Sequence, residues 1–147
     1  MKQPIQRKNI RLKNYDYSQK GYYFITICTK DRIKILSQII NEQCKLSDIG
    51  KIAEKYIITI EEKYNVRISE YIIMPNHIHM IIIKDDEEVS ISRIIQQYKG
   101  TVSKKAKCKI WQKSFYEHII RNEKEHYKII EYIINNPIKW DEDEYNK

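Results

Sequence analysis

The sequence has few residues that interrupt secondary structure and no long apolar run. Of its 147 residues, three are glycine, three are proline and three are cysteine. The cysteines (Cys28, Cys44 and Cys108) are scattered and form no Cys-x-x-Cys pair, which argues against a disulfide framework and a thiolate metal site. Every apolar run is shorter than the roughly 20 residues that span a bilayer, and the N-terminus lacks the apolar core of a secretory signal. A reduced, cytoplasmic setting is therefore expected.

Length and the scarcity of loop residues indicate one domain. A chain of 147 residues can bury about two-thirds of its unfolded surface around a single core. No internal repeat or low-complexity linker divides it. We therefore expect a single domain over residues 1–147, with a basic N-terminal arm at about residues 1–20 and an acidic tail at residues 141–147.

The net charge of +7 is concentrated in two segments. Residues 1–20 contain six lysines and arginines against one acid, and residues 89–116 contain seven against none. Such segments predict a polyanionic partner, of which nucleic acid is the common one. A basic surface that serves only solubility is the alternative that charge alone leaves open.

Apolar periodicity predicts the element order β, α, β, β, α, β, α. Helical spacing of apolar residues covers residues 46–63, with Ser47 or Asp48 as the N-cap, and a second helix opens near Ser90. Asn122 and Glu125 form a capping-box pattern for the last helix, which Pro137 ends. Strands are expected at residues 22–29, 67–74 and 77–84, with a short fourth at 110–112. This order predicts an α+β fold of the ferredoxin-like kind, with a mainly antiparallel sheet and helices packed on one face.

Two histidines open the third expected strand, directly after a Met74-Pro75-Asn76 turn. Strand side chains alternate between faces, so His77 and His79 point the same way, with their Cα atoms roughly 7 Å apart. Two imidazoles at that distance can converge on one ion, which makes the pair half of a metal site. Two hydrogen-bonded histidines on a solvated sheet face are the alternative interpretation of the pair alone.

On the last predicted helix, Tyr132 and Asn136 are four residues apart and lie on one face. With these residues the chain resembles the REP-associated tyrosine transposases, within the single-tyrosine His-hydrophobic-His insertion-sequence transposase family. The resemblance covers nearly the whole chain, from about Arg7 to Trp140. Its segments are Arg11-Leu12-Lys13-Asn14-Tyr15-Asp16-Tyr17-Ser18, the strand from Phe24 to Thr29, Met74-Pro75-Asn76-His77-Ile78-His79, Trp111-Gln112, Glu117-His118-Ile119-Ile120-Arg121 and Tyr132-Ile133-Ile134-Asn135-Asn136-Pro137.

The resemblance implies a role for each of four residues. His77 and His79 correspond to two metal ligands, Tyr132 to the nucleophile, and Asn136 to the amide that completes the metal site, where related transposases carry glutamine. The implied cofactor is Mg²⁺ or Mn²⁺, and imidazole ligands shift the preference toward Mn²⁺. Tyr132 would attack single-stranded DNA and form a 5′-phosphotyrosine and a free 3′-hydroxyl, and a second 3′-hydroxyl would rejoin the strand.

Other aromatic residues compete for these roles. Tyr116 is the rival nucleophile; its place in a presumed turn before the last helix, without a ligand-type residue one turn on, argues against it. Tyr127 is expected to pack or to flank the site. His118 is expected either to orient a group behind the metal ligands or to make a structural hydrogen bond. Trp111 is expected in the core rather than as a platform for a base.

The resemblance and the charge pattern together identify the expected partner as single-stranded or hairpin DNA from palindromic repeats. DNA contacts are expected from the basic arm and from the second helix, through Arg7, Lys8, Arg11, Lys13, Lys99, Lys104 and Lys105. No membrane partner is expected, and the protein is placed in the cytoplasm beside the nucleoid. The sequence leaves open whether it acts as a monomer or a homodimer, and whether Tyr132 completes its own site or a neighbour's.

Three other functions fit parts of the sequence. A domesticated, non-catalytic hairpin-DNA-binding protein is the main alternative, although the intact His77, His79, Tyr132 and Asn136 argue against it. An RNA-binding ferredoxin-like module would leave the histidine pair unexplained and lacks the usual aromatic-rich strand. A phosphodiesterase for small molecules would make no use of the basic segments.

Overall fold

The computed structural model describes residues 21–85 and 89–146, so the predicted DNA contacts of Arg7, Lys8, Arg11 and Lys13 lie outside the described residues. Within these ranges no helix is long and apolar enough to cross a membrane. The elements are β1 (Gly21–Cys28), η2 (Lys30–Arg32), β2 (Ser37–Ile40), β3 (Gln43–Leu46), α2 (Asp48–Tyr64), β4 (Arg67–Ile73), β5 (His77–Lys84), α3 (Ile91–Ala106), β6 (Tyr116–Ile119), α4 (Glu123–Asn135) and η3 (Trp140–Glu142).

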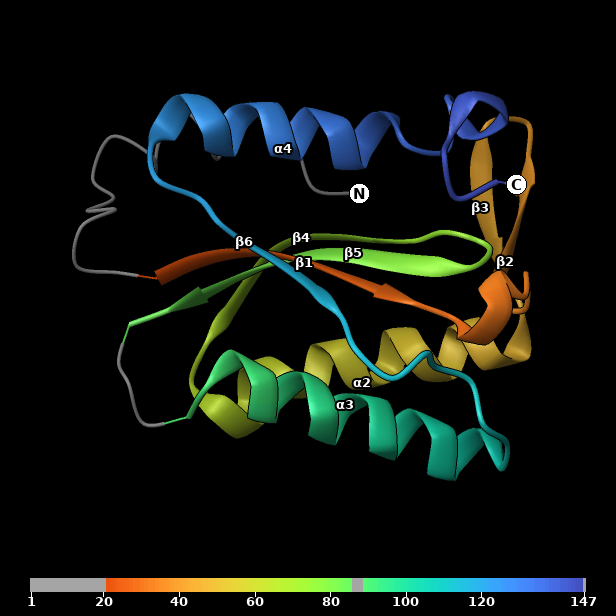
Figure 1. Ribbon diagram of the computed structural model, residues 1–147, viewed down its shortest axis with the longest axis horizontal. Helices are drawn as coiled ribbons and strands as arrows, with labels where there is room; N and C mark the ends of the chain where they lie inside the picture. Colours follow the sequence, from red (N-terminus) through yellow and green to blue (C-terminus); the bar gives the residue numbers. More distant parts are fainter. Residues whose placement is uncertain (1–20, 86–88, 147) are drawn as a thin grey trace.

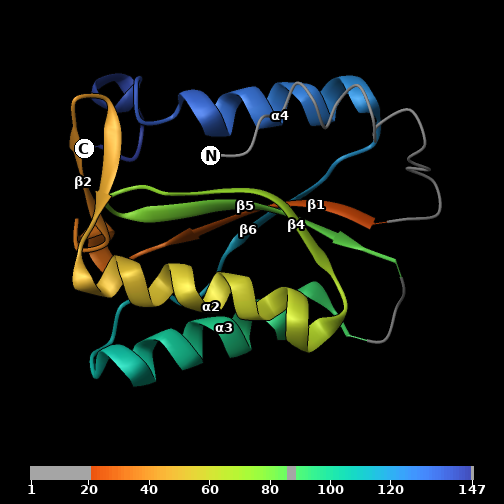
Figure 2. The same ribbon diagram turned by 180° about the vertical axis from the view of Figure 1, so that it is seen from behind.

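Four of the strands form one antiparallel sheet in the order β4-β5-β1-β6, and β2 and β3 form a separate hairpin. The predicted α+β, ferredoxin-like architecture is confirmed. Helices α2 and α3 lie together on one face of the sheet, as predicted (Figures 1 and 2). Helix α4 differs from the prediction of helices on one face, because it covers the opposite face.

The central strand β5 explains why both faces need a helix. All eight of its residues are buried, which is typical of a strand covered on both sides. On one side Ile78, Met80 and Ile82 join the main core under α2 and α3. On the other side Ile81 and Ile83 join a smaller cluster, which α4 completes with Ile130 and Ile133. Packing of α4 removes this second apolar surface from water.

The three predicted helix starts are confirmed by side-chain caps. The Ser47 hydroxyl accepts from the Gly50 amide at 3.0 Å, and the Ser90 hydroxyl accepts from the Arg93 amide at 3.1 Å. The side-chain oxygen of Asn122 accepts from the Glu125 amide at 2.8 Å. Each cap satisfies one of the amides that the first helical turn leaves without a partner.

Two strand predictions were wrong or incomplete. The fourth strand of the sheet is β6 rather than residues 110–112, where Trp111 makes one isolated bridge to Thr29. The β2–β3 hairpin was not predicted; its two-residue turn places Asn41 and Glu42 at positive φ, 52° and 63°. An Asn-Gly turn would have signalled this hairpin, and Asn-Glu does not.

The helical glycines Gly50 and Gly100 differ in the space available for a side chain. A Cβ on Gly50 would lie 2.0 Å from the Leu36 carbonyl oxygen, a backbone atom, whereas a Cβ on Gly100 would meet nothing within 4 Å. Gly50→Ala is expected to destabilise the protein by about 2 kcal/mol, because α2 must move away from Leu36. Gly100→Ala is expected to stabilise it by about 0.5–1 kcal/mol, because alanine favours the helix. Urea unfolding of both variants measures the difference, and equal effects would contradict the packing of α2 described above.

Candidate active site

The two predicted histidine ligands lie side by side at the start of β5. His77 pairs with Cys28 and His79 pairs with Thr26 across the antiparallel β1–β5 ladder. Their side chains are 0% and 2% exposed, and their ring centroids are 4.6 Å apart. They lie on the sheet face that α4 covers, since Ile81 and Ile83 continue the same side of the strand. The prediction that both imidazoles share one face is therefore confirmed in the fold.

Hydrogen bonds orient both rings through Nδ1. His77 Nδ1 lies 2.9 Å from Asn76 Oδ1, and the Asn76 amide nitrogen donates to the Tyr145 and Arg32 carbonyl oxygens. Because Asn76 Oδ1 can only accept, His77 Nδ1 carries the proton and Nε2 carries the lone pair. His79 Nδ1 lies 2.9 Å from the Thr26 hydroxyl, which leaves its Nε2 facing the site as well. This is the arrangement in which metal-binding histidines are held.

Three buried polar atoms have no hydrogen-bond partner at this point of the described structure. They are His77 Nε2, His79 Nε2 and the side-chain oxygen of Asn136. Burial of a polar atom without a partner costs free energy, so a cluster of three such atoms indicates that something outside the chain completes them. Two imidazole nitrogens and one amide oxygen fit a divalent cation that keeps open positions for substrate oxygens.

Burial keeps both imidazoles in the neutral form that a metal requires. It lowers the pKa of His77 from its ordinary value to about 4 and that of His79 well below its ordinary value, the latter with a smaller contribution from His77. Within the described ranges no three His, Cys, Asp or Glu residues are arranged to hold a metal ion. The third polar atom of this cluster is instead the side-chain oxygen of Asn136, a residue that is 4% exposed.

Tyr132 lies at the open side of this cluster. Its ring centroid is 5.2 Å from that of His79 and 6.3 Å from that of Phe24, and the side chain is 44% exposed. The spacing predicted from the helix holds, because Asn136 follows one turn later at the C-cap of α4. Partial burial raises the pKa of the Tyr132 phenol, and the nearby Asp143 carboxylate adds to this effect.

The rival tyrosine, Tyr116, has a different position from the one predicted. It opens β6 rather than lying in a turn, and it pairs with Thr26, which pairs with His79. Tyr116 therefore points to the same sheet face as His79, but two strands away, about 10 Å between Cα atoms at the usual strand spacing. It is 59% exposed, at the edge of the sheet. Contact with the His79 ring thus distinguishes Tyr132 from Tyr116.

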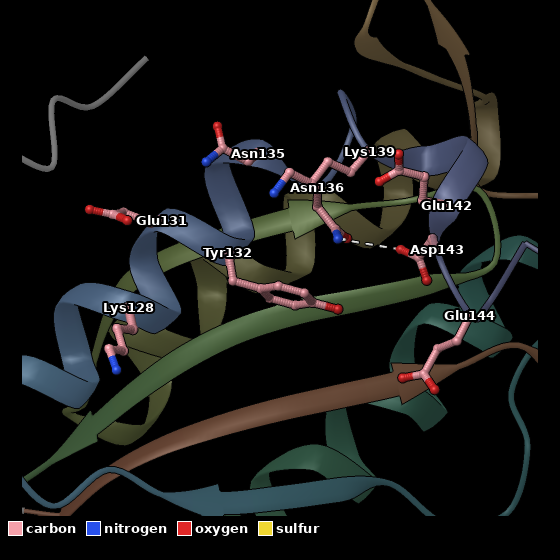
Figure 3. A pocket seen from close by; sticks show the side chains of 9 residues that line it. All are labelled: Lys128, Glu131, Tyr132, Asn135, Asn136, Lys139, Glu142, Asp143 and Glu144. Carbon is pink, nitrogen blue, oxygen red and sulfur yellow. Dashed lines mark hydrogen bonds between the residues drawn. The ribbon is translucent and has the colours of Figure 1, made fainter.

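The C-terminal segment, predicted only as an acidic tail, contributes to the site. Asp143 Oδ2 accepts from Asn136 Nδ2 at 3.3 Å and lies 4.0 Å from His77 Nε2. The Tyr145 ring lies against His77 with centroids 4.3 Å apart. Figure 3 shows the Tyr132 phenol extending from α4 with its hydroxyl on the side of Asn136 and Asp143. This role could not be predicted from the acidic run, because the sequence alone does not indicate that the tail folds back to His77.

Other predicted residues lie away from the histidines. Lys99 is 9% exposed, and its ammonium donates to the carbonyl oxygens of residues 112, 113 and 114 at 2.7, 3.3 and 3.3 Å. Lys104 and Lys105 are exposed in the last turn of α3. His118 Nε2 lies 2.9 Å from Glu125 Oε2, one of the two outcomes expected for it.

Comparison with known proteins places this chain in a family. The model of the family described as "Transposase IS200 like" matches residues 17–136. An uncharacterized protein of Haemophilus influenzae is 37% identical over 166 residues, covering 94% of this chain and 92% of its own length. A REP-associated tyrosine transposase of Escherichia coli is 27% identical over 124 residues, covering 84% and 70% of the two chains.

A solved structure agrees with the fold. The structure of a REP-associated tyrosine transposase bound to a REP hairpin superposes with a TM-score of 0.68 at 24% identity, over 82% of this chain and 68% of that one. The resemblance predicted from the Met-Pro-Asn-His-x-His and Tyr-x-x-x-Asn-Pro motifs is thereby confirmed. The chain belongs to the family of IS200-like transposases.

Proposed function

We propose that this protein nicks and rejoins hairpin-forming single-stranded DNA, with Tyr132 as the nucleophile and with Mg²⁺ or Mn²⁺ held by His77, His79 and Asn136. One observation carries the proposal: the Tyr132 ring contacts His79 beside three buried polar atoms that have no hydrogen-bond partner in the described structure. One relative is a REP-associated tyrosine transposase, and a solved structure of such a transposase is bound to a REP hairpin; both support hairpin-forming DNA as the substrate.

The reaction is an exchange of one phosphodiester for another. The Tyr132 oxygen forms a bond to the scissile phosphorus, the phenol gives up its proton, and the bond to the 3′-oxygen breaks. The 3′-oxygen takes a proton, and the DNA stays attached to the protein through its 5′-phosphate. Attack by a 3′-hydroxyl reverses these steps, so no ATP is needed. When bound, a divalent ion supplies the positive charge that offsets the developing negative charge on phosphate.

Positive charge beside Tyr132 would offset the raised pKa of its phenol. An ordinary tyrosine, with a pKa near 10, is phenolate in only about one molecule in a thousand at pH 7, and Tyr132 is less acidic still. Four carboxylates and two lysines line the cavity of about 500 Å³ beside it. A phosphate therefore meets net negative charge there unless a cation is bound.

The proposal extends to the residues that contact DNA and to the location of the protein in the cell. Lys104 and Lys105, exposed at the end of α3, are proposed to contact phosphates, with the arm residues Arg7, Lys8, Arg11 and Lys13. The contact predicted for Lys99 is not proposed, because its buried ammonium donates to the carbonyl oxygens of residues 112, 113 and 114. A cytoplasmic place beside the nucleoid follows from a chromosomal DNA substrate. Both a monomer and a homodimer are compatible with this proposal. The alternative function, a hairpin-binding protein without catalysis, is distinguished by the next experiment.

Covalent trapping tests the nucleophile. Labelled single-stranded oligonucleotides carrying palindromes, incubated with protein and Mn²⁺ or Mg²⁺, are expected to give a protein–DNA band on a denaturing gel. Tyr132→Phe is expected to abolish this band, because phenylalanine lacks the attacking oxygen, while Tyr116→Phe retains it. Loss of the band only in Tyr116→Phe would reassign the nucleophile. Tight hairpin binding without a band in the unaltered protein would favour the non-catalytic alternative.

Calorimetric titration with Mn²⁺ tests the ligands without relying on activity. His79→Gln and Asn136→Ala are each expected to weaken Mn²⁺ binding more than tenfold, because each removes a donor atom from the cluster. His118→Gln is the matched control, since His118 is paired with Glu125 outside the cluster. Equal affinity in all three variants would exclude this metal site.

The pH dependence of Mn²⁺ binding tests the burial of the imidazoles. Because the pKa of His77 is about 4 and that of His79 lies well below its ordinary value, both rings stay neutral from pH 7.5 to 5.5. Affinity is expected to change by less than about threefold over this range. If both imidazoles had ordinary pKa values, the affinity for Mn²⁺ would instead fall roughly 100-fold at pH 5.5.

In the metal-free protein, the free energy of unfolding is expected to decrease as the pH falls below about 6.5. The reason is that the unfolded chain takes up protons on these two histidines at a higher pH than the folded chain does.

A further inference from the structure

The C-terminal segment, residues 140–146, brings one buried carboxylate into the candidate active site. The Asp143 side chain is 3% exposed. Both of its oxygens accept a hydrogen bond, Oδ1 from the Tyr145 amide at 2.8 Å and Oδ2 from Asn136 Nδ2 at 3.3 Å. Figure 3 shows the second bond as the dashed line between the two side chains. The carboxylate is therefore in direct contact with the third polar atom group of the histidine cluster.

Hydrogen bonds to the backbone fix this part of the C-terminal segment in place. Arg32 Nη1 donates to the Glu144 carbonyl oxygen at 3.1 Å, and Asn76 Nδ2 donates to the Tyr145 carbonyl oxygen at 2.6 Å. Glu144 and Tyr145 directly follow Asp143 in the chain. The position of the Asp143 carboxylate is thus set by residues on both sides of the turn that carries the histidines and on η2.

The Asn136 side chain has two ends of opposite hydrogen-bonding character. Its oxygen only accepts and offers lone pairs to a cation, whereas its nitrogen only donates. The nearby His77 Nε2 and His79 Nε2 have no hydrogen-bond partner in the described structure. Without a metal ion, hydrogen bonding alone would favour the Asn136 nitrogen facing these atoms and donating to one of them. That orientation would close the site, because the amide oxygen would point away from it.

Asp143 opposes that closed orientation. A carboxylate has no proton to donate, so it binds the nitrogen end of the Asn136 amide and repels the oxygen end. With the nitrogen held by Asp143 Oδ2, the oxygen faces the cluster, where it has no partner among the described residues. Asp143 Oδ2 also lies 4.0 Å from His77 Nε2, so its negative charge adds attraction for a cation.

We propose that Asp143 is a positioning residue of the metal site, which holds the Asn136 oxygen toward His77 and His79 and so keeps the site open for a divalent cation. The inference rests on the proposed function, because it presupposes that these three residues hold the metal. A carboxylate is needed rather than an amide, because both of its oxygens must accept, one from Tyr145 and one from Asn136.

Calorimetric titration with Mn²⁺ of Asp143→Asn tests this role with little change in side-chain size. Its single oxygen is expected to stay with the Tyr145 amide, the shorter of the two bonds, so that an NH₂ group faces Asn136 and turns the Asn136 oxygen away. Mn²⁺ affinity is expected to fall about 30-fold. Unchanged affinity would overturn the proposal.

Glu142→Gln is the matched control. It removes the same charge from an exposed residue that lines the same cavity, and it is expected to weaken Mn²⁺ binding by less than about threefold. Equal weakening by Glu142→Gln and Asp143→Asn would reduce the effect to general electrostatics and overturn the positioning role.

A double-mutant cycle separates the orientation of Asn136 from the charge of Asp143. In an Asn136→Ala background there is no amide to orient, so Asp143→Asn is expected to weaken Mn²⁺ binding only about threefold, against about 30-fold in the unaltered background. The same fold-change in both backgrounds would overturn the proposal, because the carboxylate would then act on the cation without Asn136.

Nitrogen-15 NMR of the histidines tests the orientation in the metal-free protein. In Asp143→Asn the Asn136 nitrogen is expected to donate to His77 Nε2 or His79 Nε2 and to shift that resonance, whereas Glu142→Gln leaves both unchanged. Addition of Asn136→Ala to Asp143→Asn is expected to remove the shift. Absence of a shift in Asp143→Asn, or its persistence without Asn136, would contradict the proposed orientation.

His79→Gln distinguishes a failure of this inference from a failure of the proposed function. Weaker Mn²⁺ binding in His79→Gln together with full affinity in Asp143→Asn would overturn the role of Asp143 alone. Full affinity in His79→Gln would overturn the metal site itself, and the role of Asp143 with it.

Discussion

Burial of two imidazoles in a strand that is covered on both faces is the constraint on which this structure depends. Strand β5 is enclosed by α2 and α3 on one side and by α4 on the other. A polar ring in such a layer is costly unless each nitrogen finds a partner. The Nδ1 atoms of His77 and His79 find Asn76 and Thr26, and their Nε2 atoms face inward with the Asn136 oxygen. The apolar packing thus explains both why the rings are neutral and why their Nε2 atoms have no hydrogen-bond partner.

The same packing positions the proposed nucleophile. Ile130 and Ile133 attach α4 to the sheet face that carries the histidines, and the helical repeat then turns Tyr132 and Asn136 toward them. The proposed nucleophile is therefore held by a helix, whereas the scissile phosphate would come from outside. A site of this kind depends on precise delivery of its substrate, which is the task that a bound DNA hairpin would perform.

Charge is divided between two neighbouring surfaces of the molecule. Carboxylates surround Tyr132, and the C-terminal segment places Asp143 and Tyr145 next to His77. Cations prevail in a separate groove, which Lys30, Arg32, Lys109 and Lys113 border. For a polyanion, the groove attracts and the cavity repels, so a phosphate enters the cavity favourably only with a divalent ion. Substrate binding and metal binding are in this way expected to support each other at one end of the sheet.

Features that depend on near neighbours could be predicted from the sequence. They are the caps at Ser47, Ser90 and Asn122, the strands around the Met74-Pro75-Asn76 turn, and the shared face of His77 and His79. Three other features became visible only in the folded chain: α4 covers the second face, Tyr116 lies in the sheet in line with His79, and Asp143 returns to the histidines. A cap or a strand alternation is decided within a few residues of chain. Contacts between residues far apart in the chain depend on how layers stack, and a strand such as β5, apolar on both faces, does not specify which helix covers which side.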